Sequence, residues 1–136
     1  MKFLVLSRYN IEKGLWLSGI EEPYIIISVT DPDRMDADIP NNPLCCGILR
    51  LKFWDLINIY NENYHRLFNL DDAVAIKIFV DKHDVGYIIC QCEAGISRSA
   101  AIAAALCKRF NINNDFFSSP YNPNMLVYDT LVSLQK

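Results

Sequence analysis

Hydrophobic runs along the chain alternate with segments that carry helix signals. The continuous β-branched run Tyr24–Val29 predicts a central strand, and Lys2–Ser7 and Tyr87–Cys92 predict two more buried strands. Apolar and polar residues alternate with period 2 at Ile48–Phe53, which predicts a strand nearer the sheet edge. The segment Asp31–Pro43 holds three prolines and four aspartates, which is typical of a loop.

Three later segments predict helices. Asn69 is expected to cap one that ends near Lys82–His83, while Ser99–Phe110 is alanine-rich and Met125–Leu134 closes the chain. The apolar face of the first of these helices is expected at Val74, Ala75, Ile78 and Phe79. Strands that alternate with helices predict a single α/β domain over residues 1–136, with a mostly parallel central sheet and helices on both faces.

Composition narrows the class of protein. Half of the 136 residues are apolar (51%) and the net charge is −3, which argues against a broad surface for nucleic acid or for a membrane. No apolar stretch is long enough to span a bilayer. The five cysteines are odd in number and no export signal precedes them, so we expect reduced thiols in the cytoplasm. Neither Cys45-Cys46 nor Cys90 with Cys92 has the usual zinc-ligand spacing, and no metal is expected.

The segment Cys92–Ser99, here called the cysteine loop, is the most informative part of the sequence. It lies between a predicted buried strand and a predicted helix, at the sheet edge where α/β proteins bind ligands. Five residues separate Cys92 from Arg98, enough for the backbone N–H groups to form a nest for a tetrahedral anion. Gly95 permits the tight turn, and Arg98 can hold two phosphate oxygens. The start of the predicted helix, the nest of N–H groups and Arg98 all stabilise negative charge. Together they favour the thiolate form of Cys92 over the thiol.

Two further residues of the loop have expected roles. The Ser99 hydroxyl can donate to the sulfur, and Ser97 is expected to cap the helix. Glu93, Ala94, Gly95, Ile96 and Ser97, together with Arg98, are the expected substrate-binding residues.

This pattern resembles the Cys-x5-Arg-Ser/Thr signature of the protein-tyrosine and dual-specificity phosphatases, in particular their small bacterial members. The segment Ile27–Pro32 looks like the early strand and loop of that family, and Asn122-Pro123-Asn124 looks like its last turn. The family usually has histidine before the nucleophile, whereas this chain has Gln91, which can bond the backbone but cannot become charged.

The resemblance also implies an aspartate that protonates the leaving group from a neighbouring loop. Asp55 fits that role, because it follows the strand Ile48–Phe53 and lies 37 residues before Cys92. Trp54 is expected to shield it. Asp55 could instead, or in addition, cap the helical segment ahead of Ile57–Tyr60. The alternative acids are Asp33, Asp36 and Asp38 in the earlier loop.

Several single residues also have a simpler structural interpretation. Cys92 alone would be a buried apolar residue at a strand end, but that interpretation does not explain Gly95 and Arg98 at these offsets. Cys90 is expected to be a core thiol. The aromatic residues Tyr60, Tyr64 and Phe68 are expected in the core, and the two histidines, His65 and His83, are expected to be structural or exposed.

The resemblance implies a phosphatase that cleaves phosphomonoesters through a phosphocysteine intermediate without a cofactor. The expected substrate is a phosphorylated protein, carrying phosphotyrosine or also phosphoserine and phosphothreonine, or a small phosphomonoester. Phosphate, sulfate and vanadate are the expected anions. The first alternative is a catalytically weak pseudophosphatase module that binds phosphate; the second is a sulfur-transfer or arsenate-reducing enzyme. Phosphoinositides are disfavoured because Glu93 and Ile96 are not basic. The oligomeric state is left open.

Overall fold

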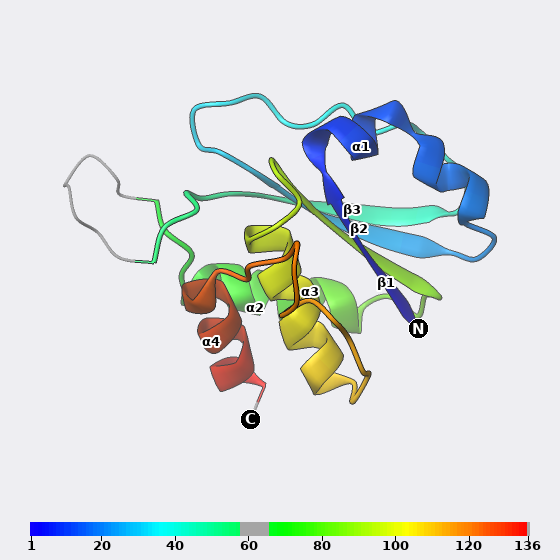
Figure 1. Ribbon diagram of the computed structural model, residues 1–136. Helices are drawn as coiled ribbons and strands as arrows, with labels where there is room; N and C mark the ends of the chain where they lie inside the picture. Colours follow the sequence, from blue (N-terminus) through cyan, green and yellow to red (C-terminus); the bar gives the residue numbers. More distant parts are fainter. Residues whose placement is uncertain (58–65, 136) are drawn as a thin grey trace.

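The computed structural model describes residues 1–57 and 66–135. In this part of the chain, a helix follows three of the four strands, and a loop without a helix joins the second strand to the third (Figure 1). The strands are β1 (Lys2–Ser7), β2 (Tyr24–Thr30), β3 (Cys45–Lys52) and β4 (Tyr87–Cys92). The helices are α1 (Arg8–Lys13), the short 3₁₀ helix η1 (Leu15–Gly19), α2 (Leu70–Asp81), α3 (Arg98–Arg109) and α4 (Met125–Leu134).

The described strands form one parallel sheet in the order β1-β4-β2-β3. Helices α1 and η1 cover one face, and α2, α3 and α4 cover the other (Figure 1). Every residue of β2 and β4 is buried, whereas β3, at the edge, alternates partly buried and exposed positions over most of its length. The predicted single α/β fold and the edge position of β3 are therefore confirmed. The sheet is entirely parallel, because each strand returns through a crossover that covers one of its faces.

Helix α2 begins where the sequence predicts it, but it buries a different face. The Asn69 side chain accepts the backbone N–H of Asp72 at 3.0 Å, and the Asp72 carboxylate accepts the N–H of Asn69 at 3.0 Å. The residues buried from this helix include Ala73, Ile76 and Val80. The expected face was wrong: Val74 and Ile78 are exposed, and Ala75 and Phe79 are only partly buried. Apolar residues occur on all sides of α2, so only the packing partners select its buried side.

Other predictions have mixed outcomes. Phe68 is buried and packs edge-to-face on Phe53 with ring centroids 5.0 Å apart, as expected for a core residue. The predicted Tyr60, Tyr64 and His65 lie outside the described residues. His83 follows α2 and its Nδ1 lies 2.7 Å from the carbonyl of Phe79.

The described residues offer neither a candidate membrane span nor a candidate metal site. None of the helices in this part of the chain combines the length and apolar character that a membrane span needs. Within the same residues, no group of three His, Cys, Asp or Glu side chains could hold a metal ion.

Candidate active site

The cysteine loop connects the end of β4 to the start of α3, at the carboxyl edge of the sheet. In the sheet register, Cys92 pairs with Ser7 of β1, and Gln91 pairs with Ser28 of β2. The strand that carries Cys92 therefore has a neighbour on each side, and Arg98 is the first residue of α3. This arrangement places the thiol beside a helix N-terminus, where free N–H groups favour an anion.

Polar groups of the loop surround the sulfur of Cys92. Its Sγ lies 3.0 Å from the Ser99 hydroxyl and accepts the backbone N–H of Gly95 at 3.3 Å. Cys92 is 2% exposed and Ser99 is fully buried. The hydrogen bonds suit a sulfur that carries negative charge, because each group can donate to it.

Gly95 is required at the turn of the loop. Its φ is +70°, and a Cβ added there would lie 2.5 Å from the backbone nitrogen of Ser7. Only glycine adopts this conformation readily and tolerates so close a strand. The end of β1 therefore holds the loop against the sheet.

Carbonyl groups of the loop are held from outside. Four carbonyl oxygens of the loop accept hydrogen bonds from residues outside it. The carbonyl of Cys92 accepts from Gln91 Nε2 at 3.0 Å, and that of Glu93 accepts from the Arg8 N–H at 3.1 Å. The carbonyl of Ile96 accepts from the Asn122 N–H at 3.0 Å, and that of Ser97 accepts from the Asn124 N–H at 3.1 Å. The C=O and N–H of a trans peptide point in opposite directions. These bonds therefore turn the following N–H groups away from the outside partners, which is the arrangement that an anion nest needs.

Arg98 is buried and held along one edge. Its Nη1 donates to the carbonyl of Phe53 at 2.7 Å and forms an ion pair with Asp31 at 2.8 Å. The side chain is about 5% exposed, and its Nε has no hydrogen-bond partner among the described residues. A buried donor without a partner costs roughly 1–3 kcal/mol. A phosphate oxygen would supply the missing acceptor.

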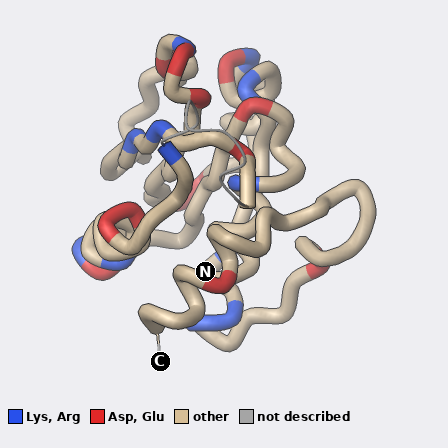
Figure 2. The backbone as a smooth tube through the Cα atoms, turned by 90° about the vertical axis from the view of Figure 1, so that its left-hand side faces the viewer, with Lys and Arg blue, Asp and Glu red and all other residues tan. Residues whose placement is uncertain are grey.

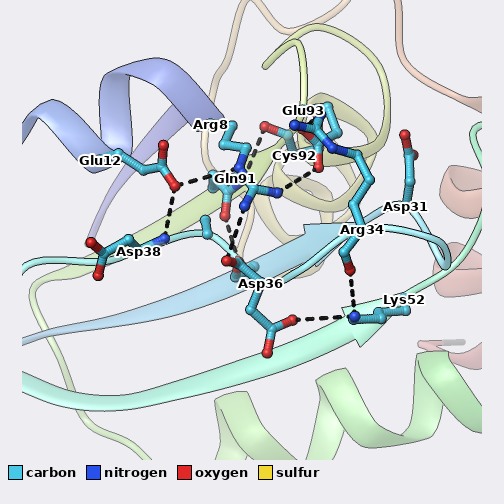
Figure 3. Close-up of polar contacts among 12 residues, drawn as sticks. Arg8, Glu12, Asp31, Arg34, Asp36, Asp38, Lys52, Gln91, Cys92 and Glu93 are labelled. Carbon is cyan, nitrogen blue, oxygen red and sulfur yellow. Dashed lines mark hydrogen bonds and ion pairs between the residues drawn. The ribbon is translucent and has the colours of Figure 1, made fainter.

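Glu93 is tied to two other elements (Figure 3). Its carboxylate accepts from Arg8 at 3.1 Å and from Arg34, in the loop after β2, at 2.7 Å. Ile96, another expected substrate-binding residue, is 38% exposed.

In the view of Figure 2, basic and acidic positions are interleaved, so the charge on that side of the molecule is mixed.

Asp55 is exposed and lies beside the cysteine loop. Its Oδ1 accepts from the Ser97 hydroxyl at 2.8 Å and from Asn124 Nδ2 at 2.9 Å. Ser97 takes the expected cap position of α3 and its carbonyl accepts the N–H of Ala101, but its hydroxyl bonds to Asp55 and not to the helix. The helical segment that Asp55 was expected to cap lies mainly outside the described residues.

The alternative acids stand elsewhere. The Asp36 carboxylate lies 3.9 Å from Arg50 and 4.0 Å from Lys52, both on β3. Asp33 is exposed, and the backbone N–H of Asp38 donates to Glu12. Of the four candidate acids, Asp55 is the one with a hydrogen bond to the cysteine loop.

A hollow adjoins this carboxylate. Its volume is about 380 Å³, and it is lined by Asp55, Leu56, Ile57, Ser97 and the segment 122–125. A larger hollow of 530 Å³ lies between the start of β1 and the segment 112–116 and includes no residue of the cysteine loop. The smaller hollow is therefore the one next to the candidate chemistry.

The other buried cysteines differ from Cys92 in their surroundings. Cys90 is fully buried, and burial raises the pKa of its thiol far above the usual range, with the nearby Cys107 and Cys92 adding to the effect. Burial raises the pKa of Cys107 to about 11. The prediction that Cys90 is a core thiol is confirmed, and among the described residues neither thiol has the donors that surround Cys92.

Several residues of this site were not predicted. Asp31 directly follows the buried β2, a position at the carboxyl edge that is a signal for a site residue. Asn124 directly precedes α4 and accepts the N–H of Val127 as a cap, while its Nδ2 reaches Asp55. Arg8 and Ser28 carry no local signal, because their partners lie far away in sequence.

Comparisons with known proteins support the fold. No protein-family model matches the chain, and no curated protein sequence matches it. Among solved structures, the chain is similar to the human tyrosine phosphatase-like serine/threonine/tyrosine-interacting protein, with a TM-score of 0.63 and 20% identity over 98% of this chain and 90% of that one. The protein has a phosphatase-like fold.

Proposed function

We propose that the protein is a cysteine-dependent phosphatase that hydrolyses phosphomonoesters, with Cys92 as nucleophile. Phosphotyrosine on proteins is the first substrate class, and phosphoserine and phosphothreonine are the second. The observation that carries the proposal is the sulfur of Cys92 held between the Ser99 hydroxyl at 3.0 Å and the Gly95 N–H at 3.3 Å. A neutral core thiol needs no such donors.

The proposed reaction has two steps. The Cys92 thiolate attacks phosphorus, the S–P bond forms and the P–O bond to the leaving group breaks, while Asp55 gives its proton to the leaving oxygen. In the second step a water attacks the phosphorus of the phosphocysteine and passes a proton to Asp55. The S–P bond breaks, and phosphate and the Cys92 thiolate are released. Arg98 and the loop N–H groups stabilise the negative oxygens in both steps.

Three structural features support these roles. The buried Nε of Arg98 lacks an acceptor, so a phosphate oxygen would satisfy it. Asp55 is tied to the loop through Ser97, next to a hollow of 380 Å³. All five cysteines are free, which suits a thiolate enzyme in a reducing compartment such as the cytoplasm.

Substitution of the nucleophile tests the proposal. Cys92→Ser should abolish release of phosphate from an aryl phosphate while the protein still binds tungstate, because the loop N–H groups and Arg98 remain. Cys46→Ser is the matched control, since Cys46 is exposed and distant in sequence from the loop. Wild-type turnover by the Cys92→Ser protein would exclude the mechanism.

The role of Asp55 is tested by the leaving group. Asp55→Asn keeps an Oδ1 that can accept from Ser97 and Asn124, so the loop contacts survive. We expect turnover of an alkyl phosphate to fall by roughly 10²–10⁴-fold, the usual contribution of general acid catalysis, and turnover of p-nitrophenyl phosphate to fall much less. Asp33→Asn, at one of the alternative candidate acids, is the control and should leave turnover of both substrates unchanged. Equal losses for both substrates would remove Asp55 from the acid role.

A phosphate-binding module is the second candidate function. The observation that favours it is Gln91, a buried neutral amide at the position before the nucleophile. The solved structure described above is itself called phosphatase-like. Tungstate binding without any phosphate release from aryl phosphates would favour this module over the enzyme.

A further inference from the structure

A buried pair of side chains lies directly behind the cysteine loop. Ser28 on β2 and Gln91 on β4 are paired in the sheet register, and both are buried. The Ser28 hydroxyl donates to Gln91 Oε1 at 2.5 Å, and Gln91 Nε2 donates to the carbonyl of Cys92 at 3.0 Å. The two bonds form a chain from the neighbouring strand to the first peptide of the loop.

The second bond fixes the direction of one peptide. The carbonyl of Cys92 and the N–H of Glu93 belong to the same peptide and point in opposite directions. Because Gln91 holds that carbonyl from behind, the Glu93 N–H points away from Gln91, which is the direction of the loop interior. A rotated peptide would instead present its carbonyl oxygen to an incoming anion.

The first bond fixes the orientation of the amide. A flipped Gln91 would place its oxygen against the carbonyl of Cys92, two acceptors in contact. Ser28 donates to the oxygen end and so favours the orientation in which the nitrogen faces Cys92. Because both side chains are buried, an amide that keeps both partners is strongly preferred to one that loses them.

We propose that Ser28 and Gln91 together act as positioning residues that hold the first N–H of the anion nest toward the phosphate. This inference rests on the proposed function for its substrate, but it concerns anion binding and not the chemical step. In this proposal the neutral amide of Gln91 orders the loop, and Ser28 on the next strand fixes the orientation of that amide. Ser28 acts only through Gln91.

The test measures tungstate binding by calorimetry, so it does not depend on turnover. Ser28→Ala should weaken tungstate binding about fivefold to tenfold, the usual worth of one buried hydrogen bond. Ser28→Thr, which keeps the hydroxyl, should restore most of the affinity. Gln91→Met, similar in length but unable to donate, should weaken binding by about tenfold or more.

The combination of variants separates positioning from a loss of stability. Because Ser28 acts through Gln91, adding Ser28→Ala to Gln91→Met should cause no further loss of affinity. The control is Ile26→Val, which removes a buried methylene two residues before Ser28 on the same face of β2. It should lower the melting temperature and leave the tungstate affinity unchanged.

Wild-type affinity in Ser28→Ala would overturn the inference, and so would an equal loss from Ser28→Ala with and without Gln91→Met. If Gln91→Met does not fold, the pair Ser28→Ala and Ser28→Thr decides, because equal affinities in these two variants also refute the role of the hydroxyl. A wild-type protein that binds tungstate but releases no phosphate would refute the proposed catalysis and leave this inference standing. A wild-type protein that does not bind tungstate would refute both.

Discussion

Replacing Gly95 by alanine tests how rigidly the sheet supports the cysteine loop. The added Cβ would lie 2.5 Å from the nitrogen of Ser7, 2.8 Å from the carbonyl carbon of Leu6 and 2.9 Å from the Cα of Ser7. All three atoms belong to the backbone of β1, which is paired with β4 along its length. Neither side of this contact can yield by rotating a side chain.

The structure gives the magnitude of the effect. Ordinary contact begins at 3.4 Å, so the loop and β1 must separate by about 0.9 Å. Overpacking of this kind costs roughly 1–3 kcal/mol, and a left-handed φ of +70° adds roughly 1–2 kcal/mol for alanine. We therefore expect the free energy of unfolding to fall by about 2–5 kcal/mol. A misplacement of about 1 Å at reacting groups can cost roughly 100-fold in rate, so kcat/KM should fall by that factor.

Two assays measure these effects. Urea denaturation gives the free energy of unfolding, and aryl phosphate turnover gives kcat/KM for the fraction that remains folded. Gly19→Ala is the matched control, because a Cβ at Gly19 meets no atom within 4 Å, and its free energy of unfolding should change by less than about 0.5 kcal/mol. If Gly95→Ala has the stability and tungstate affinity of the wild type, the loop is not held by β1 and the reasoning about its geometry fails.

Two further predictions concern stability. Asn69→Ala should lower the free energy of unfolding by about 1 kcal/mol in urea denaturation, because it removes the acceptor for the Asp72 N–H, and an unchanged midpoint would contradict the cap. Hydrogen bonds from Arg109 and Lys77 lower the pKa of Asp81, so its contribution to stability is present above the unfolded pKa and is lost as the pH falls through the lower folded pKa. Asp81→Asn should therefore cost less than about 1 kcal/mol at pH 7, since the pair is partly exposed, and a loss that persists at a pH below the lowered folded pKa would refute this account.

The cysteine loop depends on supports from several distant parts of the chain. Gly95 contacts the end of β1, and Arg98 pairs with Asp31 after β2 and with the carbonyl of Phe53 after β3. Each of these supports comes from the carboxyl edge of a different strand. The parallel sheet brings these edges together, which explains how so short a loop can hold a fixed shape.

Local sequence was sufficient to predict an element where the interactions that stabilise it join residues close together in the chain. The β-branched run at Tyr24–Val29 predicts a buried strand because such a run suits a strand covered on both faces. Asn69 predicts a helix start because its capping partner is three residues away. The tight turn at Gly95 was predictable because Cys92, Gly95 and Arg98 lie in one short loop, while anion binding by that loop stays a prediction.

Tertiary structure decided the rest. The hydroxyl of Ser97 bonds to Asp55 and not to its own helix, because folding brings a carboxyl oxygen from 42 residues away within hydrogen-bond distance. The buried face of α2 was set by the elements it packs against, since its own pattern is apolar on all sides.

The sequence alone showed that a glutamine stands before Cys92, but not what that glutamine does. Its partner Ser28 is 63 residues away, and only the register between β2 and β4 places the two side chains opposite each other. Likewise, Asp31 meets Arg98 only because the ends of parallel strands share one edge. Local patterns determine which chemical groups a segment offers, whereas strand order and register determine which of them meet, because those depend on contacts between residues far apart in the chain.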